Sequence, residues 1–394
     1  MKRILLVAGA RPNFMKLAPL YEALTARRDT YKPILVHTGQ HYDRKMSDIF
    51  FEQLRLPEPD INLEIGSGTH GLQTGRILIE IERLMIEEKP DLVIVFGDVN
   101  STLAAAIAAV KLGVPVAHVE AGLRSNDWSM PEEINRIVAD RVSNLLFTTC
   151  EDANVNLLRE GLSEESIHFV GNTMIDSLSR FIPLADGLNV LNEFQVEPKR
   201  YILVTLHRPG NVDDPENVDA AMKMISGLSS IAPVVFPVHP RTRKSLVDYE
   251  SRNADRSILD NPNLRLTAPV GYLEFIKLEK EAAVVITDSG GVQEETTYLG
   301  TPCITTRPNT ERPVTITDGT NTLLGMNPKR VINKTRSIMG GDKPEPKRPL
   351  LWDGKAAGRI IDVLDSFFSI EPQVGYDLTK GYFSPTKAGA VDGA

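Results

Sequence analysis

Short, continuous apolar runs alternate with helix-length segments along most of this chain. Segments such as Gln73–Glu88 and Ser101–Leu112 have helical length and periodicity. Apolar strands separated by helices are typical of a parallel sheet that is covered on both faces. The pattern predicts an α/β unit of the doubly wound type in the first half. Its apolar runs are Ile4–Val7, Ile34–His37, Leu92–Phe96, Val114–Val119 and Leu145–Thr148.

The same alternation starts again after a looser stretch at residues 181–198. A chain of 394 residues is long enough for two domains of ordinary size. We expect two Rossmann-like domains, at 1–171 and 172–355, that face each other across a ligand-binding cleft. Residues 371–394 lack periodicity, which predicts a loose tail. The apolar runs of the second half are Tyr201–Thr205, Val234–Val238, Ala283–Thr287 and Cys303–Thr305.

The net charge, the apolar segments and the two cysteines exclude several classes of protein. The net charge of -8 argues against a nucleic-acid partner, because phosphate backbones require a surplus of cations. The apolar run at the N-terminus is cut by Arg11-Pro12-Asn13, which favours a buried strand over a signal peptide. No apolar segment is long enough to span a membrane. Cys150 and Cys303 lie far apart, which predicts buried free thiols in a cytoplasmic protein.

One glycine pattern resembles a cofactor signature but occurs in the wrong context. Residues 66–71 match the spacing of the dinucleotide-binding motif, and a helix follows. That motif normally follows the buried first strand of its unit, whereas the preceding residues 61–65 alternate between apolar and polar. We therefore expect no nicotinamide cofactor, and interpret the glycines as a mobile loop.

The clearest anion site is the turn Asp288-Ser289-Gly290-Gly291, which follows a buried strand and opens a helix. Glycines allow backbone N–H groups to approach a phosphate, and the helix dipole favours its charge. Glu295, further along that helix, suits the hydroxyls of a ribose, since a carboxylate repels phosphate. The alternative is an ordinary strand–helix turn with an N-terminal serine.

The matching turn of the first domain is Gly9-Ala10-Arg11-Pro12-Asn13, with Lys16 one turn later. Pro12 favours a helix start, which leaves Arg11 and Lys16 near the ligand. An arginine presents a bidentate fork to a diphosphate. Two solvated cations are the alternative interpretation.

Three carboxylates end strands or open helices in the first unit: Asp98, Glu120 and Glu132. The carboxyl edge of a parallel sheet is where open α/β proteins bind ligands, so together they predict an acid/base cluster. Each also has a structural alternative. Asp98 could cap a helix, Glu120 could pair with Arg124, and Glu132 could favour a helix N-terminus.

His207 closes the first strand of the second unit, and His239 ends the next strand. No histidine spacing matches a zinc site, so we expect no metal. A histidine beside an anion site can donate to phosphate or transfer protons.

Taken together, these segments resemble the non-hydrolysing UDP-N-acetylglucosamine 2-epimerases, which have the two-domain glycosyltransferase-B architecture. The match runs from Gly9 to about Gly325 and covers nearly all of both domains. It rests on ordered motifs rather than on apolar strands, which every α/β protein has. The motifs are Gly9-Ala10-Arg11-Pro12-Asn13, Thr38-Gly39-Gln40-His41, Gly97-Asp98, His118-Val119-Glu120-Ala121-Gly122-Leu123-Arg124, Pro131-Glu132-Glu133-Ile134-Asn135-Arg136, His207-Arg208, Ser289-Gly290-Gly291 and Thr310-Glu311-Arg312-Pro313.

The resemblance implies roles for individual residues. Asp98, Glu120, Glu132 and His207 would take part in catalysis. The nucleotide sugar would be held by Arg11, Lys16, Arg136, Ser289, Gly290, Gly291, Glu295 and Arg312, with Val270 and Phe275 facing the uracil. It also places a C-terminal helix, at about 356–370, back on the first domain. We further expect a homodimer.

One departure from the family pattern concerns regulation. Some members bind a second substrate molecule as an activator, through a doubled arginine after the catalytic histidine and residues near Gln40, His41 and His239. Here Pro209 replaces the second arginine, and Asp43 lies in the Gln40 loop. Both differences argue against activation by substrate.

The chemistry of the residues agrees with an epimerase that needs no cofactor. The inverted carbon of UDP-N-acetylglucosamine has no adjacent carbonyl to acidify its hydrogen. Elimination of UDP and its re-addition is the accessible route, and it requires acid/base groups on both faces of the sugar and cations for the diphosphate. We expect conversion to UDP-N-acetylmannosamine for surface polysaccharide synthesis. A hydrolysing 2-epimerase and a UDP-sugar glycosyltransferase of the same architecture are the alternatives, and a non-catalytic nucleotide-sugar sensor is a third.

Overall fold

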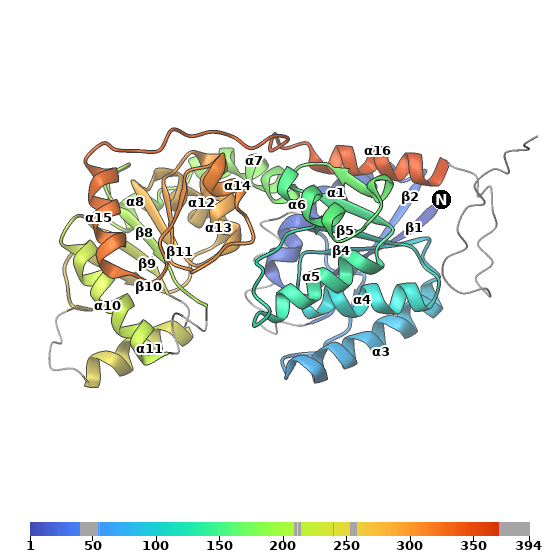
Figure 1. Cartoon of the computed structure of the whole chain (residues 1–394), viewed down its shortest axis with the longest axis horizontal. Coiled ribbons are helices and arrows are strands. Elements are labelled where there is room, and N and C mark those ends of the chain that lie inside the picture. The colour runs from blue at the N-terminus through green and yellow to red at the C-terminus, as the bar shows by residue number, and fades with distance from the viewer. Residues whose placement is uncertain are drawn as a thin grey trace, which may run out of the picture.

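Two parallel sheets, each covered by helices on both faces, form the two halves of the protein (Figure 1). The computed structural model describes residues 1–39, 54, 56–208, 211, 214–238, 240–252 and 258–369. All strand pairings in both sheets are parallel. The predicted pair of Rossmann-like α/β units is therefore confirmed.

Within the described residues, the first sheet has seven strands in the order β3-β2-β1-β4-β5-β6-β7. Its strands are β1 (Lys2–Ala8), β2 (Tyr31–His37), β3 (Ile61–Asn62), β4 (Leu92–Phe96), β5 (Val116–Ala121), β6 (Leu145–Thr148) and β7 (Ile167–Phe169). The helices between them are α1 (Arg11–Ala26), α3 (His70–Glu88), α4 (Asn100–Lys111), α5 (Pro131–Val142) and α6 (Glu151–Arg159).

In the part of the second half that the structure describes, the sheet has six strands in the order β10-β9-β8-β11-β12-β13. Its strands are β8 (Ile202–Thr205), β9 (Val234–Pro237), β10 (Leu264–Thr267), β11 (Val284–Thr287), β12 (Cys303–Thr305) and β13 (Asn321–Leu323). Its helices are α8 (Val190–Glu193), α10 (Pro215–Ser229), α11 (Pro240–Arg252), α12 (Tyr272–Glu281), α13 (Gly290–Leu299), α14 (Val314–Thr317) and α15 (Pro328–Met339).

Alternate residues of each central strand enter different apolar cores. In β1, Ile4 and Leu6 pack with helices that include α1, whereas Leu5 and Val7 pack with α3 and α4. Both sets are buried, which is why the strand reads as one continuous apolar run. The second sheet repeats this division, with α10 and α15 on one face and α12 on the other.

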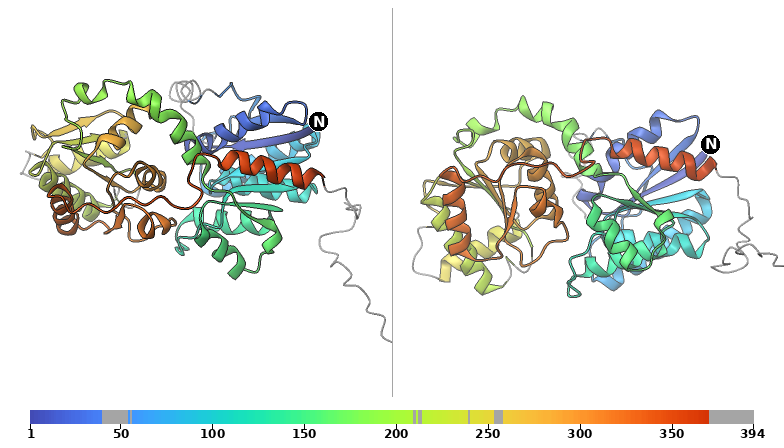
Figure 2. Two further views of the ribbon diagram at one scale, coloured as in Figure 1. Left: turned by 90° about the horizontal axis from the view of Figure 1, so that it is seen from above. Right: turned by 45° about the horizontal axis from the view of Figure 1, so that its top comes forward.

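Two helices connect the halves. Helix α7 (Thr173–Asp186) packs against α1 of the first half and α12 of the second. Helix α16 (Ala356–Ser369) returns to the first half, where Asp365 bonds to Arg27 and Tyr31 (Figure 2). The first part of the stretch that we expected to be loose is thus helical. Phe181 is buried there because apolar residues recur at helical spacing along α7.

The strand order reverses between β1 and β4 in the first sheet and between β8 and β11 in the second. Ligands of open α/β sheets bind beyond the carboxyl ends of strands at such a switch point. The turns after these four strands carry Arg11, Asp98, His207 and Ser289. Their positions at the two switch points are the structural basis of the candidate site.

Three smaller observations complete the fold. Within the described ranges, no helix is long and apolar enough to cross a membrane. Cys150 and Cys303 are free and buried, as predicted. The glycine pattern at residues 66–71 follows β3, a two-residue strand at the edge of the sheet, rather than the central β1.

Candidate active site

The centre of the site is Glu120, whose backbone is strained. It adopts a left-handed φ of 73°, at a point where the register between β5 and β6 shifts. A side-chain-bearing residue in this conformation costs free energy that the surroundings must supply, and such outliers cluster at functional sites. The Glu120 residue is only 3% exposed. Its carboxylate contacts Lys16 Nζ at 2.6 Å and Arg312 Nη2 at 3.1 Å.

Arg312 joins the two halves of the protein. It comes from the segment after β12, and it reaches Glu120 of the first sheet. Its Nε lies 3.0 Å from Glu294 Oε1, and its Nη1 pairs with Glu311. Glu294 also accepts a hydrogen bond from Asn172, which caps α7. Burial raises the pKa of the Glu294 carboxyl to about 7, although the guanidinium of Arg312 opposes that rise.

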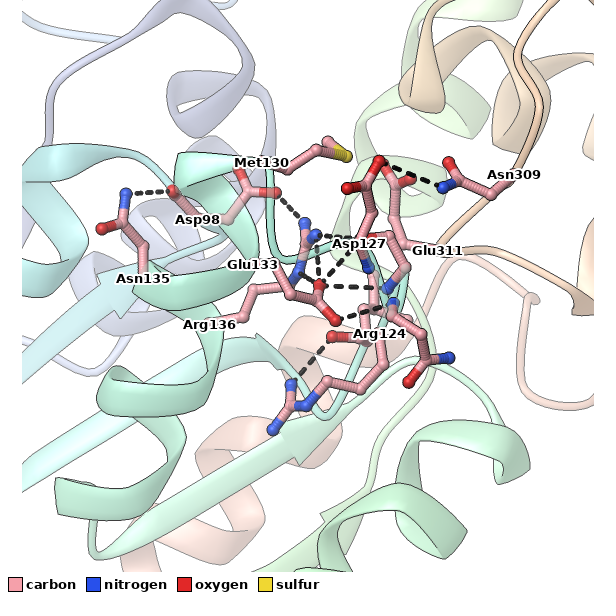
Figure 3. A network of polar contacts seen from close by, with 12 residues as sticks. Asp98, Arg124, Asp127, Met130, Glu133, Asn135, Arg136, Asn309 and Glu311 are labelled. Carbon is pink, nitrogen blue, oxygen red and sulfur yellow. Dashed lines mark hydrogen bonds and ion pairs between the residues drawn. The ribbon is translucent and has the colours of Figure 1, made fainter.

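Asp98 belongs to a second cluster of ion-paired side chains (Figure 3). Its carboxylate pairs with Arg136 of α5, and Arg136 Nη2 lies 2.7 Å from Glu133 Oε2. Helix α4 begins after Val99, and no side chain caps it. The capping interpretation of Asp98 is therefore wrong, and its carboxylate faces an arginine instead.

The proposed structural pair between Glu120 and Arg124 is also absent. Arg124 pairs with Glu160 and Asp140, each at 2.7 Å. The buried Asp140 carboxylate in turn lies 2.6 Å from His118 Nδ1. These contacts fix the turn after β5 within the first half, while the Glu120 carboxylate points to the other half of the molecule.

His207 is the corresponding group of the second half. Its Nδ1 lies 3.0 Å from Asp288 Oδ1, and Asp288 also accepts the backbone N–H groups of His207 and Arg208. Burial alone would raise the pKa of Asp288, but these interactions outweigh it and lower the pKa. The imidazole is half exposed. With Nδ1 held by a carboxylate, Nε2 is the nitrogen that can exchange protons with a ligand.

The turn Ser289-Gly290-Gly291 opens α13 next to Arg312. A Cβ atom at Gly290 would collide with the Arg312 guanidinium, and one at Gly291 would lie 3.1 Å from Met174 Cε. Because ion pairs hold the guanidinium in place, glycine at position 290 permits this close approach of Arg312. A helix N-terminus beside a buried guanidinium has the geometry and charge of an anion site.

Glu295 lies one residue beyond Glu294 but faces a different environment. It is 4% exposed and accepts a hydrogen bond from Tyr272 Oη at 3.0 Å. Burial raises its pKa to about 7. Val270 precedes α12 and Phe275 lies in it, and both pack against the apolar cluster on this side of the second sheet.

The remaining candidate site residues are Arg11, Glu132, Gln40, His41 and His239. Arg11 is the first residue of α1 and is half buried. Glu132 lies in the first turn of α5, and it makes no hydrogen bond or ion pair with another described residue. Gln40, His41 and His239 lie outside the described residues, as do the two departures, Asp43 and Pro209, and the predicted tail. The structure thus brings Lys16, Glu120 and Arg312 into direct contact, and joins Asp98 to Arg136.

Sequence reasoning assigned no role to several buried charges of this site. Arg307 pairs with Glu311 at 2.8 Å, and the neighbouring Asn309 donates to Asp127 of the first half (Figure 3). Glu311 lies inside the motif Thr310-Glu311-Arg312-Pro313, and Glu294 directly precedes Glu295. In the sequence, each is a carboxylate next to a predicted ligand-binding residue, and that position does not reveal which cation pairs with it.

Comparison with known proteins identifies the family. The sequence matches the UDP-N-acetylglucosamine 2-epimerase family profile over residues 23–365. A UDP-N-acetylglucosamine 2-epimerase of Methanocaldococcus jannaschii is 45% identical over 92% of this chain and 98% of its own. The chain belongs to the UDP-N-acetylglucosamine 2-epimerase family. It is also 42% identical to a UDP-2,3-diacetamido-2,3-dideoxy-D-glucuronate 2-epimerase of Pseudomonas aeruginosa, over 92% of this chain and 99% of that one.

Solved structures of this epimerase family agree in fold. The Methanocaldococcus jannaschii enzyme in complex with UDP-GlcNAc and UDP superposes with a TM-score of 0.83 at 44% identity, over 92% of this chain and 99% of that one. The epimerase of Neisseria meningitidis bound to UDP-GlcNAc has a TM-score of 0.80 at 28% identity, over 92% of this chain and all of that one. The expected glycosyltransferase-B-like architecture and the assignment as an epimerase are therefore confirmed.

Proposed function

We propose that this epimerase interconverts UDP-N-acetylglucosamine and UDP-N-acetylmannosamine without releasing free sugar. The observation that carries the proposal is the contact of Lys16 and Arg312 with Glu120 across the two halves. It combines a buried carboxylate of the first half with one cation from each half of the protein. The named substrates of the related enzymes support a UDP-linked acetamido sugar.

The reaction divides into two chemically balanced steps. A base removes the proton from the carbon that bears the acetamido group, and the electron pair forms a double bond to the anomeric carbon while UDP leaves with the glycosidic pair. UDP then adds back as a proton is delivered to the opposite face. Elimination places additional negative charge on the leaving diphosphate, and re-addition removes it. Cations must therefore stabilise the free UDP between the two steps.

The residues of the site match these requirements. Arg312 touches Glu120 and approaches Gly290, so a diphosphate held at the start of α13 would lie beside an acid/base group. Lys16 provides a second cation, and Asp98, Glu132 and His207 are further groups for proton transfer. Ser289, Gly290 and Gly291 would hold the phosphates, Arg11 and Arg136 would assist, and Glu295 would bind the ribose.

Proton NMR of UDP-N-acetylglucosamine with the enzyme in heavy water tests the mechanism. We expect UDP-N-acetylmannosamine that retains UDP and carries deuterium at the inverted carbon. Release of UDP and free N-acetylmannosamine would instead show a hydrolysing enzyme. Epimerisation without deuterium uptake would contradict the elimination route.

The Pseudomonas relative favours a second candidate substrate, UDP-2,3-diacetamido-2,3-dideoxy-D-glucuronate. This sugar carries the same acetamido group at the inverted carbon, so the same proton chemistry would apply. Measuring kcat/KM for both nucleotide sugars decides between them, and we expect the higher value for UDP-N-acetylglucosamine.

We also propose a homodimer, formed through α3. Leu72, Ile79 and Ile86 recur every seven residues on this helix and are 50%, 51% and 56% exposed. Arg76 and Glu82 lie three residues before and after Ile79, so two antiparallel copies of α3 would pair them across a two-fold axis. Ile79→Lys should shift the molar mass from dimer to monomer in light scattering, and Arg83→Lys serves as its control. A wild-type monomer would contradict this proposal.

We place the enzyme in the cytoplasm, where UDP-sugars for surface polysaccharides would be made. The two buried free thiols support a reducing compartment. Fractionation of cells with an antibody against the protein tests the location.

A further inference from the structure

Two buried carboxyl groups, Glu279 of α12 and Glu295 of α13, lie side by side in the second half. Their exposed fractions are 0% and 4%, α12 packs against α13, and the two carboxyl groups are close enough for a hydrogen bond when one of them carries a proton. Among the described residues, no lysine, arginine or histidine forms an ion pair with either group. Two buried carboxylates without a cation repel each other, so one of the two must keep its proton.

The contacts indicate which carboxyl carries the proton. Glu295 accepts a hydrogen bond from Tyr272 Oη at 3.0 Å, and this donor stabilises a negative charge. Neither oxygen of Glu279 accepts an N–H or a hydroxyl group from the described residues. Burial and the neighbouring Glu295 raise the pKa of Glu279 well above its ordinary value. Glu279 is therefore the carboxylic acid, and its O–H donates to Glu295.

The groups that surround the pair reinforce this assignment. Tyr201, directly before β8, and Tyr272 of α12 lie close to Glu279, as does Cys303 of β12. All three are neutral at physiological pH, because burial raises the pKa of each. The other charged neighbour is Glu294, which acts on Glu295 and has the same sign.

We propose that Glu279 is a positioning residue that, as a protonated acid, fixes the carboxylate of Glu295 to receive the two hydroxyls of the ribose. The inference rests on the ribose-binding role of Glu295 in the proposed function. Two donors, from Glu279 and Tyr272, would then set the rotamer of Glu295 before the nucleotide arrives. A carboxylate that is already oriented loses less conformational entropy on binding.

A thermodynamic cycle with two nucleotides tests this role. Calorimetry would measure the binding of UDP and of 2′,3′-dideoxyuridine 5′-diphosphate to wild type, Glu279→Leu and Glu279→Gln. For Glu279→Leu we expect UDP to bind about tenfold more weakly, while the dideoxy nucleotide binds as it does to wild type. Glu279→Gln retains an N–H donor in place of the O–H, so its UDP affinity should stay within about threefold of wild type.

Several results would overturn the inference. Equal weakening of both nucleotides by Glu279→Leu would indicate general damage to the second half, and unchanged affinity for both would remove any role. Equal binding of the two nucleotides to wild type would refute the ribose role of Glu295, and with it this inference. If Glu279→Leu does not fold, Tyr272→Phe removes the other donor and must show the same selective loss for UDP. None of these measurements depends on turnover, so the NMR test of the proposed function stands apart from them.

Discussion

Glu294 and Glu295 are consecutive residues of α13 and are almost equally buried, yet their charges are compensated in different ways. Glu294 faces the junction of the two halves, where the guanidinium of Arg312 lies 3.0 Å away. Glu295 faces into the second half, where its neighbours are a tyrosine and another carboxyl group. The junction is therefore held by a cation, and we propose that the ribose side is held by a shared proton. The junction should be sensitive to the loss of arginine. The pKa of Glu294 and that of Glu295 are both raised to about 7, so the ribose side should differ in its pH dependence through the additional acid, Glu279.

The largest effect should come from removing the cation of the junction. Arg312→Ala leaves Glu294 and Glu311 without their shared guanidinium, and breaking a buried ion pair costs about 3–5 kcal/mol. Chemical unfolding should show that loss, and calorimetry should show weaker UDP binding. Arg312→Lys restores the charge without the forked geometry, so it should recover part of the stability and part of the UDP affinity. Wild-type stability in Arg312→Ala would mean that the junction does not depend on this cation.

The next effect concerns catalysis at the junction. Asp98→Asn and Glu120→Gln are nearly isosteric but cannot accept a proton at neutral pH. Either should lower turnover by ~10²-fold or more while UDP still binds. Melting temperature, UDP affinity and turnover should be measured on the same preparations. A structural role would give the reverse pattern, with a lower melting temperature and near-normal turnover.

A smaller effect should distinguish the ribose side by its dependence on pH. The folded-state pKa of Glu295 is about 7, above its ordinary 4.5, and that of Glu279 is also raised well above its ordinary value. Stability from such groups is fully present below about pH 4.5 and is lost as pH rises through the folded values. Between pH 6 and 9 the melting temperature of wild type should fall about 2–4 °C more than that of Glu279→Gln. Glu274→Gln, on the same helix, is the control, and parallel curves for wild type and Glu279→Gln would argue against a shared proton.

The smallest effect should follow the loss of one hydroxyl. The side chain of Ser289 does not cap α13, so Ser289→Ala should leave the melting temperature unchanged. Its UDP affinity should fall by about 1 kcal/mol, roughly fivefold, because one donor to phosphate is removed. Affinity equal to wild type would mean that the phosphates bind elsewhere.

Much of the fold could be predicted because central parallel strands are apolar on both faces. The runs at Leu92–Phe96 and Leu145–Thr148 match β4 and β6 residue for residue. The strands that escaped prediction, β7, β10 and β13, are three or four residues long and only partly buried. Their sequences carry no continuous apolar run, and all three lie at the edge of a sheet.

The candidate site could be predicted as a set of residues but not as a set of pairs. Glu120 and Arg124 are four positions apart, which favoured a local ion pair. In the structure the partner of Glu120 is Arg312, 192 positions away. Which arginine pairs with Glu120 depends on the arrangement of the two halves and on the bulge that turns Glu120 towards the junction. Neither has a local sequence signal.

The return of α16 to the first half has a consequence for how the protein is made. Translation completes the strands of the first sheet by Phe169, but the helix that covers Tyr31 and Arg27 is synthesised about 190 residues later. Domains generally fold in the order in which they leave the ribosome. Here the second unit can finish folding while the first still exposes the apolar face that receives Ile360 and Leu364. During synthesis, the N-terminal unit is the one that needs protection from aggregation.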